Sequence, residues 1–159
     1  MYRIGHGYDS HIFTEGKYIT LAGVTIPFEK GLQSHSDGDV VIHSLCDAFL
    51  GAVSLGDMGQ HFPESDQKYA GAQSKVFLNI VKGLVQAEDF IICNIDTTIV
   101  LEKPKLQKYI LNMRENLASE LKLNVSVISI KAKTNEGMGF IGAGEGIAAF
   151  SVVMLKKDK

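Results

Sequence analysis

Apolar positions in this chain of 159 residues follow two periods, and the shorter period marks strands. Alternating or continuously apolar runs predict strands at residues 2–9, 90–101, 125–133 and 147–155. Two shorter runs, 18–21 and 24–26, predict a hairpin that turns at Ala22 and Gly23. The pattern therefore predicts four main strands and one small hairpin.

Apolar spacings of three and four residues predict three helices between these strands. Asp37 is a suitable N-cap for the first helix, which we expect to end near Gly56. The second helix is predicted at residues 74–87. Pro104 suits the first turn of the third helix, since proline has no N–H to donate and the first turn needs none.

Strands separated by helices predict a single α/β domain of the α+β type over residues 1–159. We expect one layer of about three helices on one face of a four-stranded mixed sheet. The last strand, 147–155, is apolar at nearly every position, which is typical of a strand buried on both faces. Three helices can cover only one face, so the pattern also predicts a homo-oligomer in which another copy covers the second.

The composition excludes several classes of protein. Hydrophobic residues make up 45% and charged residues 21%, as in ordinary globular proteins, and the net charge of -2 predicts no nucleic-acid or membrane partner. The two cysteines, Cys46 and Cys93, cannot build a disulfide framework, which favours a reducing, cytoplasmic setting. We recognise no targeting leader and no apolar run of the ~20 residues that a bilayer span needs.

Asp9, His11 and His43 form a candidate metal site. Side chains alternate along a strand, so Asp9 and His11 point to one side and Ser10 to the other. His43 lies one turn into the first predicted helix and can supply a third ligand. Two imidazoles and one carboxylate with an open fourth position are typical of a catalytic zinc site.

Each of these residues also fits a plainer role. A histidine in a helix is more often a hydrogen-bonded packing residue than a ligand, and Asp9 could accept backbone hydrogen bonds at the end of its strand. His6 faces away from the other three, and we interpret it as structural. Cys46 is interpreted as a small packed thiol.

Three loops are candidates for binding a phosphorylated substrate. Lys133, Thr134, Asn135 and Glu136 lead into a glycine-rich loop whose amides can meet phosphate oxygens, with Glu136 as a magnesium ligand. Residues 101–106 could bind the edge of a base through their backbone, and residues 57–59 with 62–66 could hold a sugar. Ordinary solvated loops remain the alternative for all three.

Taken together, these segments resemble one family over the whole chain: the 2-C-methyl-D-erythritol 2,4-cyclodiphosphate synthases of the non-mevalonate isoprenoid pathway. The motifs that carry the resemblance occur in the family's order at residues 3–11, 35–43, 56–63 and 139–146. The resemblance implies a homotrimer with its sheets facing the three-fold axis and with active sites between neighbouring subunits.

The resemblance also implies a reaction and its metals. The family converts 4-diphosphocytidyl-2-C-methyl-D-erythritol 2-phosphate to 2-C-methyl-D-erythritol 2,4-cyclodiphosphate and releases CMP, through attack of the 2-phosphate on the β-phosphate. It is a cyclising phosphorus–oxygen lyase. One Zn²⁺ per subunit would be held by Asp9, His11 and His43, and Mg²⁺ or Mn²⁺ at Glu136 would bridge substrate phosphates.

By the family pattern, His35 and Thr134 are the catalytic residues: His35, with Ser36, contacts the methylerythritol phosphate side, and Thr134 stabilises the transferring group. The residues implied in substrate binding are Asp9, Ser10, His11, His35, Ser36, His43, Asp57, Met58, Gly59, Phe62, Pro63, Glu64, Ser65, Asp66, Leu101, Glu102, Lys103, Pro104, Lys105, Leu106, Gln107, Lys133, Thr134, Asn135, Glu136 and Phe140.

The chain departs from the family pattern at three places. Lys133 stands where many members carry threonine, and Glu102 with Lys103 alters the side chains of the cytosine loop. Ala143 replaces an arginine that members commonly use to hold an isoprenoid diphosphate in the central cavity, which makes that ligand doubtful here. None of the three removes an implied metal ligand.

Two other functions stay open on the sequence. A zinc phosphodiesterase would use the same three ligands to activate water and would give a linear product. A non-catalytic trimeric module that binds nucleotides or isoprenoids would release no CMP at all.

Overall fold

The computed structural model describes residues 1–158 and contains a mixed five-stranded sheet in the order β4-β1-β7-β5-β6. Its strands are β1 (Tyr2–Glu15), β4 (Lys30–Leu32), β5 (Phe90–Val100), β6 (Ile128–Lys133) and β7 (Gly146–Lys157). β5 and β6 are parallel, and the other neighbours are antiparallel. A separate hairpin consists of β2 (Tyr18–Leu21) and β3 (Val24–Pro27). The mixed α/β architecture is as predicted.

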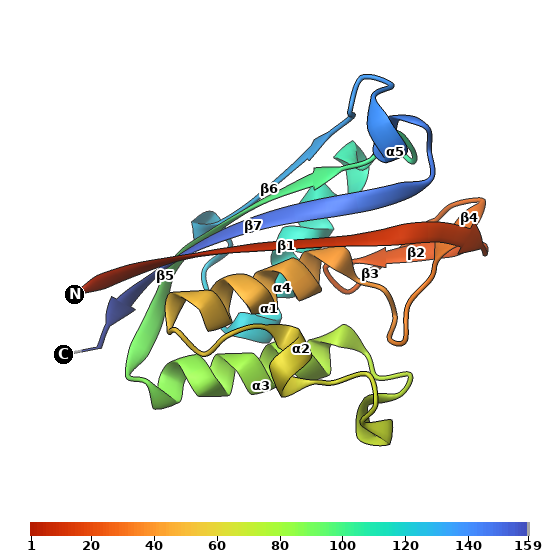
Figure 1. Cartoon of the computed structure of the whole chain (residues 1–159). Helices are drawn as coiled ribbons and strands as arrows, with labels where there is room; N and C mark the ends of the chain where they lie inside the picture. Colours follow the sequence, from red (N-terminus) through yellow and green to blue (C-terminus); the bar gives the residue numbers. More distant parts are fainter. Residues whose placement is uncertain (159) are drawn as a thin grey trace.

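Three long helices lie on one side of the sheet (Figure 1). They are α1 (Val40–Ala52), α3 (Ser74–Ala87) and α4 (Ile110–Leu121), and α1 lies between the sheet and α3. Two four-residue helices, α2 (Met58–His61) and α5 (Gly139–Gly142), interrupt segments that we expected to be loops. Single turns of 3-10 helix occur at Gln67–Tyr69, Gln107–Tyr109 and Val125–Val127. Within residues 1–158, no helix combines the length and apolarity that a bilayer crossing requires.

Several predicted boundaries are wrong, for local reasons. β1 continues to Glu15 because it pairs first with β7 and then with β4, a three-residue strand that the sequence pattern does not reveal. Asp39, not Asp37, caps α1. α1 ends at Ala52, before Gly56. The third long helix begins at Ile110, so Pro104 lies in the loop before it.

The closest packing in the fold is between α1 and β1, at Gly5 and Gly7. A β-carbon added at Gly5 would lie 1.8 Å from the carbonyl oxygen of Ala48, and one at Gly7 would lie 1.8 Å from that of Ser44. Only glycine permits a backbone approach this close. The helix therefore rests directly on the strand, with no layer of side chains between them at these points.

The sheet face opposite the helices is apolar and exposed in the single chain. Residues of β1 and β7 that pair across this face include Tyr8 with Phe150. The exposed fractions reach 72% for Ile4 and 63% for Ile12. The opposite face of β7 is buried, with Val153 and Leu155 fully inaccessible. The apolar face thus matches the pattern from which we predicted an oligomer, and the oligomer itself stays a prediction.

Asp39 joins α1 to the β2–β3 hairpin. Its side chain is fully buried and accepts hydrogen bonds from Ile42 N at 3.1 Å, Ala22 N at 2.9 Å and Gly23 N at 2.7 Å. Burial raises the pKa of this carboxyl to about 6, although the three backbone donors oppose the shift. One side chain thus satisfies both a helix end and a hairpin turn.

Replacing Asp39 with alanine should lower the free energy of unfolding by about 2 to 4 kcal/mol, because a helix cap is lost and two turn amides lose their acceptor. Urea unfolding monitored by circular dichroism measures the change. Asp57→Ala is the matched control, since Asp57 caps the short exposed helix α2 and its loss should cost much less. Equal losses in the two variants would contradict the role given to Asp39.

Candidate active site

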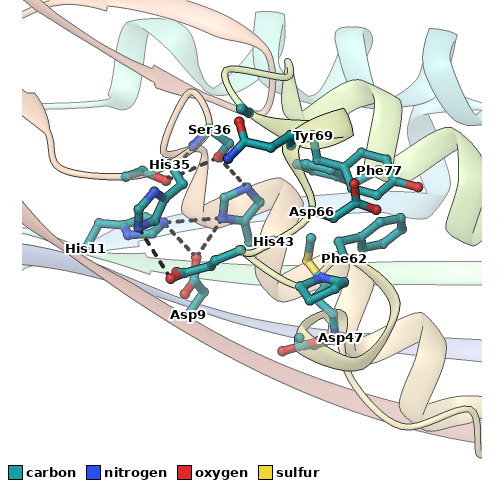
Figure 2. A pocket seen from close by; sticks show the side chains of 17 residues that line it. Asp9, His11, His35, Ser36, His43, Asp47, Phe62, Asp66, Tyr69 and Phe77 are labelled. Carbon is teal, nitrogen blue, oxygen red and sulfur yellow. Dashed lines mark hydrogen bonds and ion pairs between the residues drawn. The ribbon is translucent and has the colours of Figure 1, made fainter.

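Asp9, His11 and His43 converge on one point, as the alternation of β1 predicted (Figure 2). His11 Nε2 and His43 Nδ1 each lie 3.1 Å from Asp9 Oδ2, and the two nitrogens lie 3.2 Å from each other. Asp9 and His11 come from the face of β1 that carries the two packed glycines, and His43 comes from the first turns of α1. The close contact of α1 with β1 therefore places the third ligand beside the first two.

These three atoms fit a tetrahedral divalent metal ion. Ligands held at about 2.0 to 2.2 Å from a tetrahedral ion lie about 3.3 to 3.6 Å apart, slightly more than the distances found here. The donor set, two imidazole nitrogens and one carboxylate oxygen, suits zinc among the divalent ions. Three protein ligands leave a fourth position for a substrate oxygen or water.

The charges at this point couple the three side chains. Burial alone would raise the pKa of Asp9, but hydrogen bonds and charge interactions with His11 and His43 lower it to about 2. Burial would lower the pKa of His43, whereas the Asp9 hydrogen bond and the charges of Asp9, Asp39 and Asp37 raise it above its ordinary value. Asp9 is thus an ionised ligand near neutral pH, and the raised pKa of His43 means that protons compete with a metal ion for this histidine more strongly than for an ordinary one.

A pocket of about 530 Å³ opens above this point. Predicted site residues that line it are Asp9, His11, His35, Ser36, His43, Met58, Gly59, Phe62, Pro63, Glu64 and Asp66. Residues that we did not predict also line it: Ser34, Asp47, Gln67, Tyr69, Ala70 and Phe77. Phe62, Tyr69 and Phe77 form an aromatic wall with ring centroids 4.8 to 5.6 Å apart.

Other residues of the predicted substrate set lie outside this pocket. Asp57 is exposed and caps α2 through Gln60 N at 3.0 Å. Ser10 faces the open side of the sheet and lines a different pocket together with Phe140, Ala143 and Glu145. Their roles in substrate binding stay predictions.

Ser65 is exposed in the segment after α2 and lines neither the metal pocket nor the next one, and the remaining predicted residues form a second cluster at the ends of β5 and β6. Leu101, Glu102, Pro104, Lys105, Leu106, Gln107, Lys133 and Thr134 line one pocket of about 450 Å³, and Lys103 lines a neighbouring one. Asn135 N donates to Glu102 Oε1 at 2.8 Å and so links the two loops. Glu136 is exposed and has a positive φ of 52° beside Gly137.

The two clusters are separated within one chain. Asp9 pairs with Ala149, Ala149 with Ile99, and Ile99 with Ala132, so three strand spacings, or about 14 Å, lie between β1 and β6 at this level. Thr134 and Glu136 follow the end of β6. The metal ligands and the glycine-rich loop of one chain therefore do not meet at the same pocket.

Sequence reasoning also missed a residue behind the metal ligands, Ser74. Its hydroxyl lies 2.8 Å from His43 Nε2, and its side chain is fully buried. The available signal was weak, because a serine at the start of a predicted helix is expected to act as a local cap. Only the packing of α3 on α1 places it beside His43.

Comparisons with known proteins agree over nearly the whole chain. The YgbB family model matches residues 2–156. The chain is 54% identical over 157 residues to the 2-C-methyl-D-erythritol 2,4-cyclodiphosphate synthase of Brachyspira hyodysenteriae, with 99% of both chains covered. The Plasmodium falciparum IspF structure, a CDP complex, has a TM-score of 0.87 at 34% identity and covers 99% of this chain and 97% of that one.

A longer protein contains the same fold. The bifunctional IspDF from Campylobacter jejuni matches with a TM-score of 0.95 at 42% identity, over 99% of this chain. The present chain covers 42% of that protein, so the likeness concerns less than half of it.

Replacing His43 with alanine should weaken Zn²⁺ binding by more than about 100-fold, because removing a ligand costs more than the 10- to 100-fold typical of an outer partner. Titration of the metal-stripped protein against a competing chelator measures this. His6→Ala is the control, since His6 lies on the opposite face of the same strand. Unchanged binding in His43→Ala would contradict the site.

Metal affinity should fall as the pH falls. The pKa of His43 is raised above 6.5 in the metal-free chain, so proton competition begins above that pH and strengthens as the pH drops through the raised value. Asp9, with its pKa of about 2, stays ionised over this pH range and should contribute nothing to the pH dependence of the metal affinity. Competition titrations between about pH 6 and pH 8 test this, and a flat affinity over that range would be inconsistent with His43 as a ligand.

Proposed function

The chain belongs to the YgbB family, and we propose for it the reaction that its curated relatives' name states, the synthesis of 2-C-methyl-D-erythritol 2,4-cyclodiphosphate. The substrate is 4-diphosphocytidyl-2-C-methyl-D-erythritol 2-phosphate, and the second product is CMP. The enzyme is a phosphorus–oxygen lyase of the non-mevalonate isoprenoid pathway.

One observation carries this proposal beyond the family match. The three side chains that the family motifs assign to a metal converge at the floor of the pocket that the other motifs line. Because those motifs come from β1, α1, α2 and the segment after α2, their convergence depends on the fold and was not contained in their spacing.

The reaction is an internal substitution at phosphorus. An oxygen of the 2-phosphate forms a bond to the β-phosphorus, and the bond from that phosphorus to the oxygen bridging the α-phosphate breaks. CMP leaves with that oxygen, so no water is consumed and no protein nucleophile is needed. The protein must therefore position the two phosphates and neutralise their charge.

Residues of the metal pocket and of the second cluster together account for these tasks. His35 lies at the rim, 76% exposed in its side chain and 3.3 Å from Glu64, where it can contact the methylerythritol phosphate. Thr134 and the amides of the glycine-rich loop stabilise the transferring group. Asp9, His11 and His43 would hold Zn²⁺, which would supply Lewis-acid polarisation of a substrate phosphate, and Glu136 would hold Mg²⁺ or Mn²⁺, which would supply neutralisation of phosphate charge.

We place the active site between two subunits of a homotrimer. The separation of about 14 Å between β1 and β6 means that one chain alone offers two half-sites. The exposed apolar face of the sheet supplies a surface for assembly. In a closed ring, the loops at 101–107 and 133–136 of one subunit complete the metal pocket of its neighbour.

We propose further that the pocket beside Ala143 binds isoprenoid diphosphates weakly. Its charged residues are Glu15, Glu29, Glu145 and Lys30, an excess of negative charge. Lys30 Nζ already donates to Gly144 O at 3.0 Å. An alanine offers no donors to a diphosphate, whereas an arginine would offer a bidentate pair.

Purified protein incubated with the diphosphocytidyl substrate and with Zn²⁺ and Mg²⁺ should release CMP and cyclic diphosphate in equal amounts. Phosphorus NMR separates the cyclic product from a linear one. Hydrolysis to a linear product would instead indicate a phosphodiesterase, and an absence of CMP would indicate a binding module.

Mixing two inactive variants tests the shared site. His43→Ala chains keep an intact Glu136 loop, and Glu136→Ala chains keep intact metal ligands. When the two variants are refolded together, at most about one in three sites of each mixed trimer should be active. Only one interface of such a trimer pairs intact metal ligands from one subunit with an intact Glu136 loop from the next. Verified mixed trimers that stay inactive would contradict the shared site and leave the reaction assay unaffected.

A further inference from the structure

The nitrogen of His43 that faces away from the metal point has partners of its own. His43 Nε2 lies 2.8 Å from Ser74 Oγ and 3.2 Å from Ser36 Oγ. Figure 2 shows His43 between Ser36 on one side and Asp9 with His11 on the other. Ser74 is the first residue of α3 and is completely buried, so water cannot replace it as a partner.

The hydrogen of the Ser74 hydroxyl is already in use. Ser74 Oγ is hydrogen-bonded to Asp37 Oδ1, and Ser74 N donates to Asp37 Oδ2 at 2.9 Å. An ionised carboxylate only accepts hydrogen bonds, so the hydroxyl must be the donor in this pair. Ser74 Oγ can therefore only accept from His43 Nε2.

This direction determines which nitrogen of His43 keeps its proton. If Nε2 donates to Ser74, its proton is held there, and the proton that a metal ion displaces is the one on Nδ1. Nδ1 is the atom that faces Asp9 Oδ2 at 3.1 Å and His11 Nε2 at 3.2 Å. Outer hydrogen bonds of this kind orient metal-bound histidines and raise their basicity.

Ser36 is the weaker of the two hydroxyl partners. Its Oγ is 0.4 Å farther from His43 Nε2 than Ser74 Oγ is, from 3.2 and 2.8 Å, and it also accepts from Gly38 N at 3.3 Å. Asp37, in contrast, binds Ser74 through both carboxylate oxygens and so caps α3. The stronger connection runs from Asp37 through Ser74 to His43.

We propose that Ser74 and Asp37 are positioning residues for the metal ligand His43: the Asp37 carboxylate orients the Ser74 hydroxyl, which holds His43 Nε2–H and leaves Nδ1 for the metal. The proposal rests on the metal centre of the proposed function. It also gives α3 a part in that centre, since the start of this helix determines where the Ser74 hydroxyl lies.

Ser74→Ala should weaken Zn²⁺ binding by about 10- to 100-fold, the loss typical of removing an outer hydrogen-bond partner. The affinity is measured by titrating metal-stripped protein with Zn²⁺ in the presence of a competing chelator. Ser151→Ala is the matched control, because Ser151 is an equally buried serine whose hydroxyl bonds Ser44 and Thr97, with no contact to His43 among the described hydrogen bonds. The control should bind Zn²⁺ within about two-fold of wild type.

A second measurement follows the proton itself. In the NMR spectrum of the zinc-loaded wild type, His43 should show an Nε2–H signal that exchanges slowly with water, and Ser74→Ala should lose it. A purely structural role for Ser74 would leave the signal in place. The measurement on wild type also decides the matter if Ser74→Ala does not fold.

The proposal would be overturned if Ser74→Ala bound Zn²⁺ as tightly as the wild type and kept the Nε2–H signal. It would also be overturned if His43 of the wild type showed no protected Nε2–H signal. Failure of the wild type to bind Zn²⁺ would instead contradict the metal centre itself. The two failures are distinguishable, because the Nε2–H signal can also be followed in the metal-free chain.

Discussion

The contact of α1 with β1 is the constraint on which the rest of the site depends. Gly7 lies under Ser44 and Gly5 under Ala48, so the helix runs antiparallel to the strand. Two strand residues advance about 6.7 Å and four helix residues about 6.0 Å, so the two elements stay nearly in register. Continuing by one step brings Asp9 beneath the first turn of α1, where His43 meets Asp9 and His11.

The same packing concentrates negative charge around His43. Asp39 caps α1, Asp37 caps α3, and Asp9 lies between the two histidines. Carboxylates are stabilised at helix N-termini, where backbone N–H groups are free, and the charges of these three carboxylates raise the pKa of His43. The two histidines in turn lower the pKa of Asp9 to about 2. The site is thus prepared for a divalent ion by the way its helices begin.

The width of the sheet separates the two clusters of predicted site residues within one chain. Asp9 and His11 lie on β1 and His43 lies on α1, whereas the loops predicted to bind the base and the phosphates follow β5 and β6, with β7 in between. The two clusters cannot approach each other within one chain, because β7 and β5 lie between β1 and β6 and are hydrogen-bonded to their neighbours on both sides. In the proposed trimer, the exposed apolar face of the sheet would pack against the other copies, whereas the metal ligands lie on the opposite, helix-covered side of β1.

The sequence by itself determined whatever depends on local period and on family motifs. Alternation in β1 placed Asp9 and His11 on one side, and the spacing of apolar residues located α3 at its observed bounds. The tertiary structure decided which residue takes each role where the sequence offers more than one candidate of the right type. Asp37 and Asp39 are both suitable caps for α1 by residue type; Asp39 takes that place, and the position of α3 makes Asp37 an acceptor for Ser74 N instead. Ser74 became a partner of His43 for the same reason: a hydrogen bond across 31 residues depends on how two helices pack, and no local pattern encodes that.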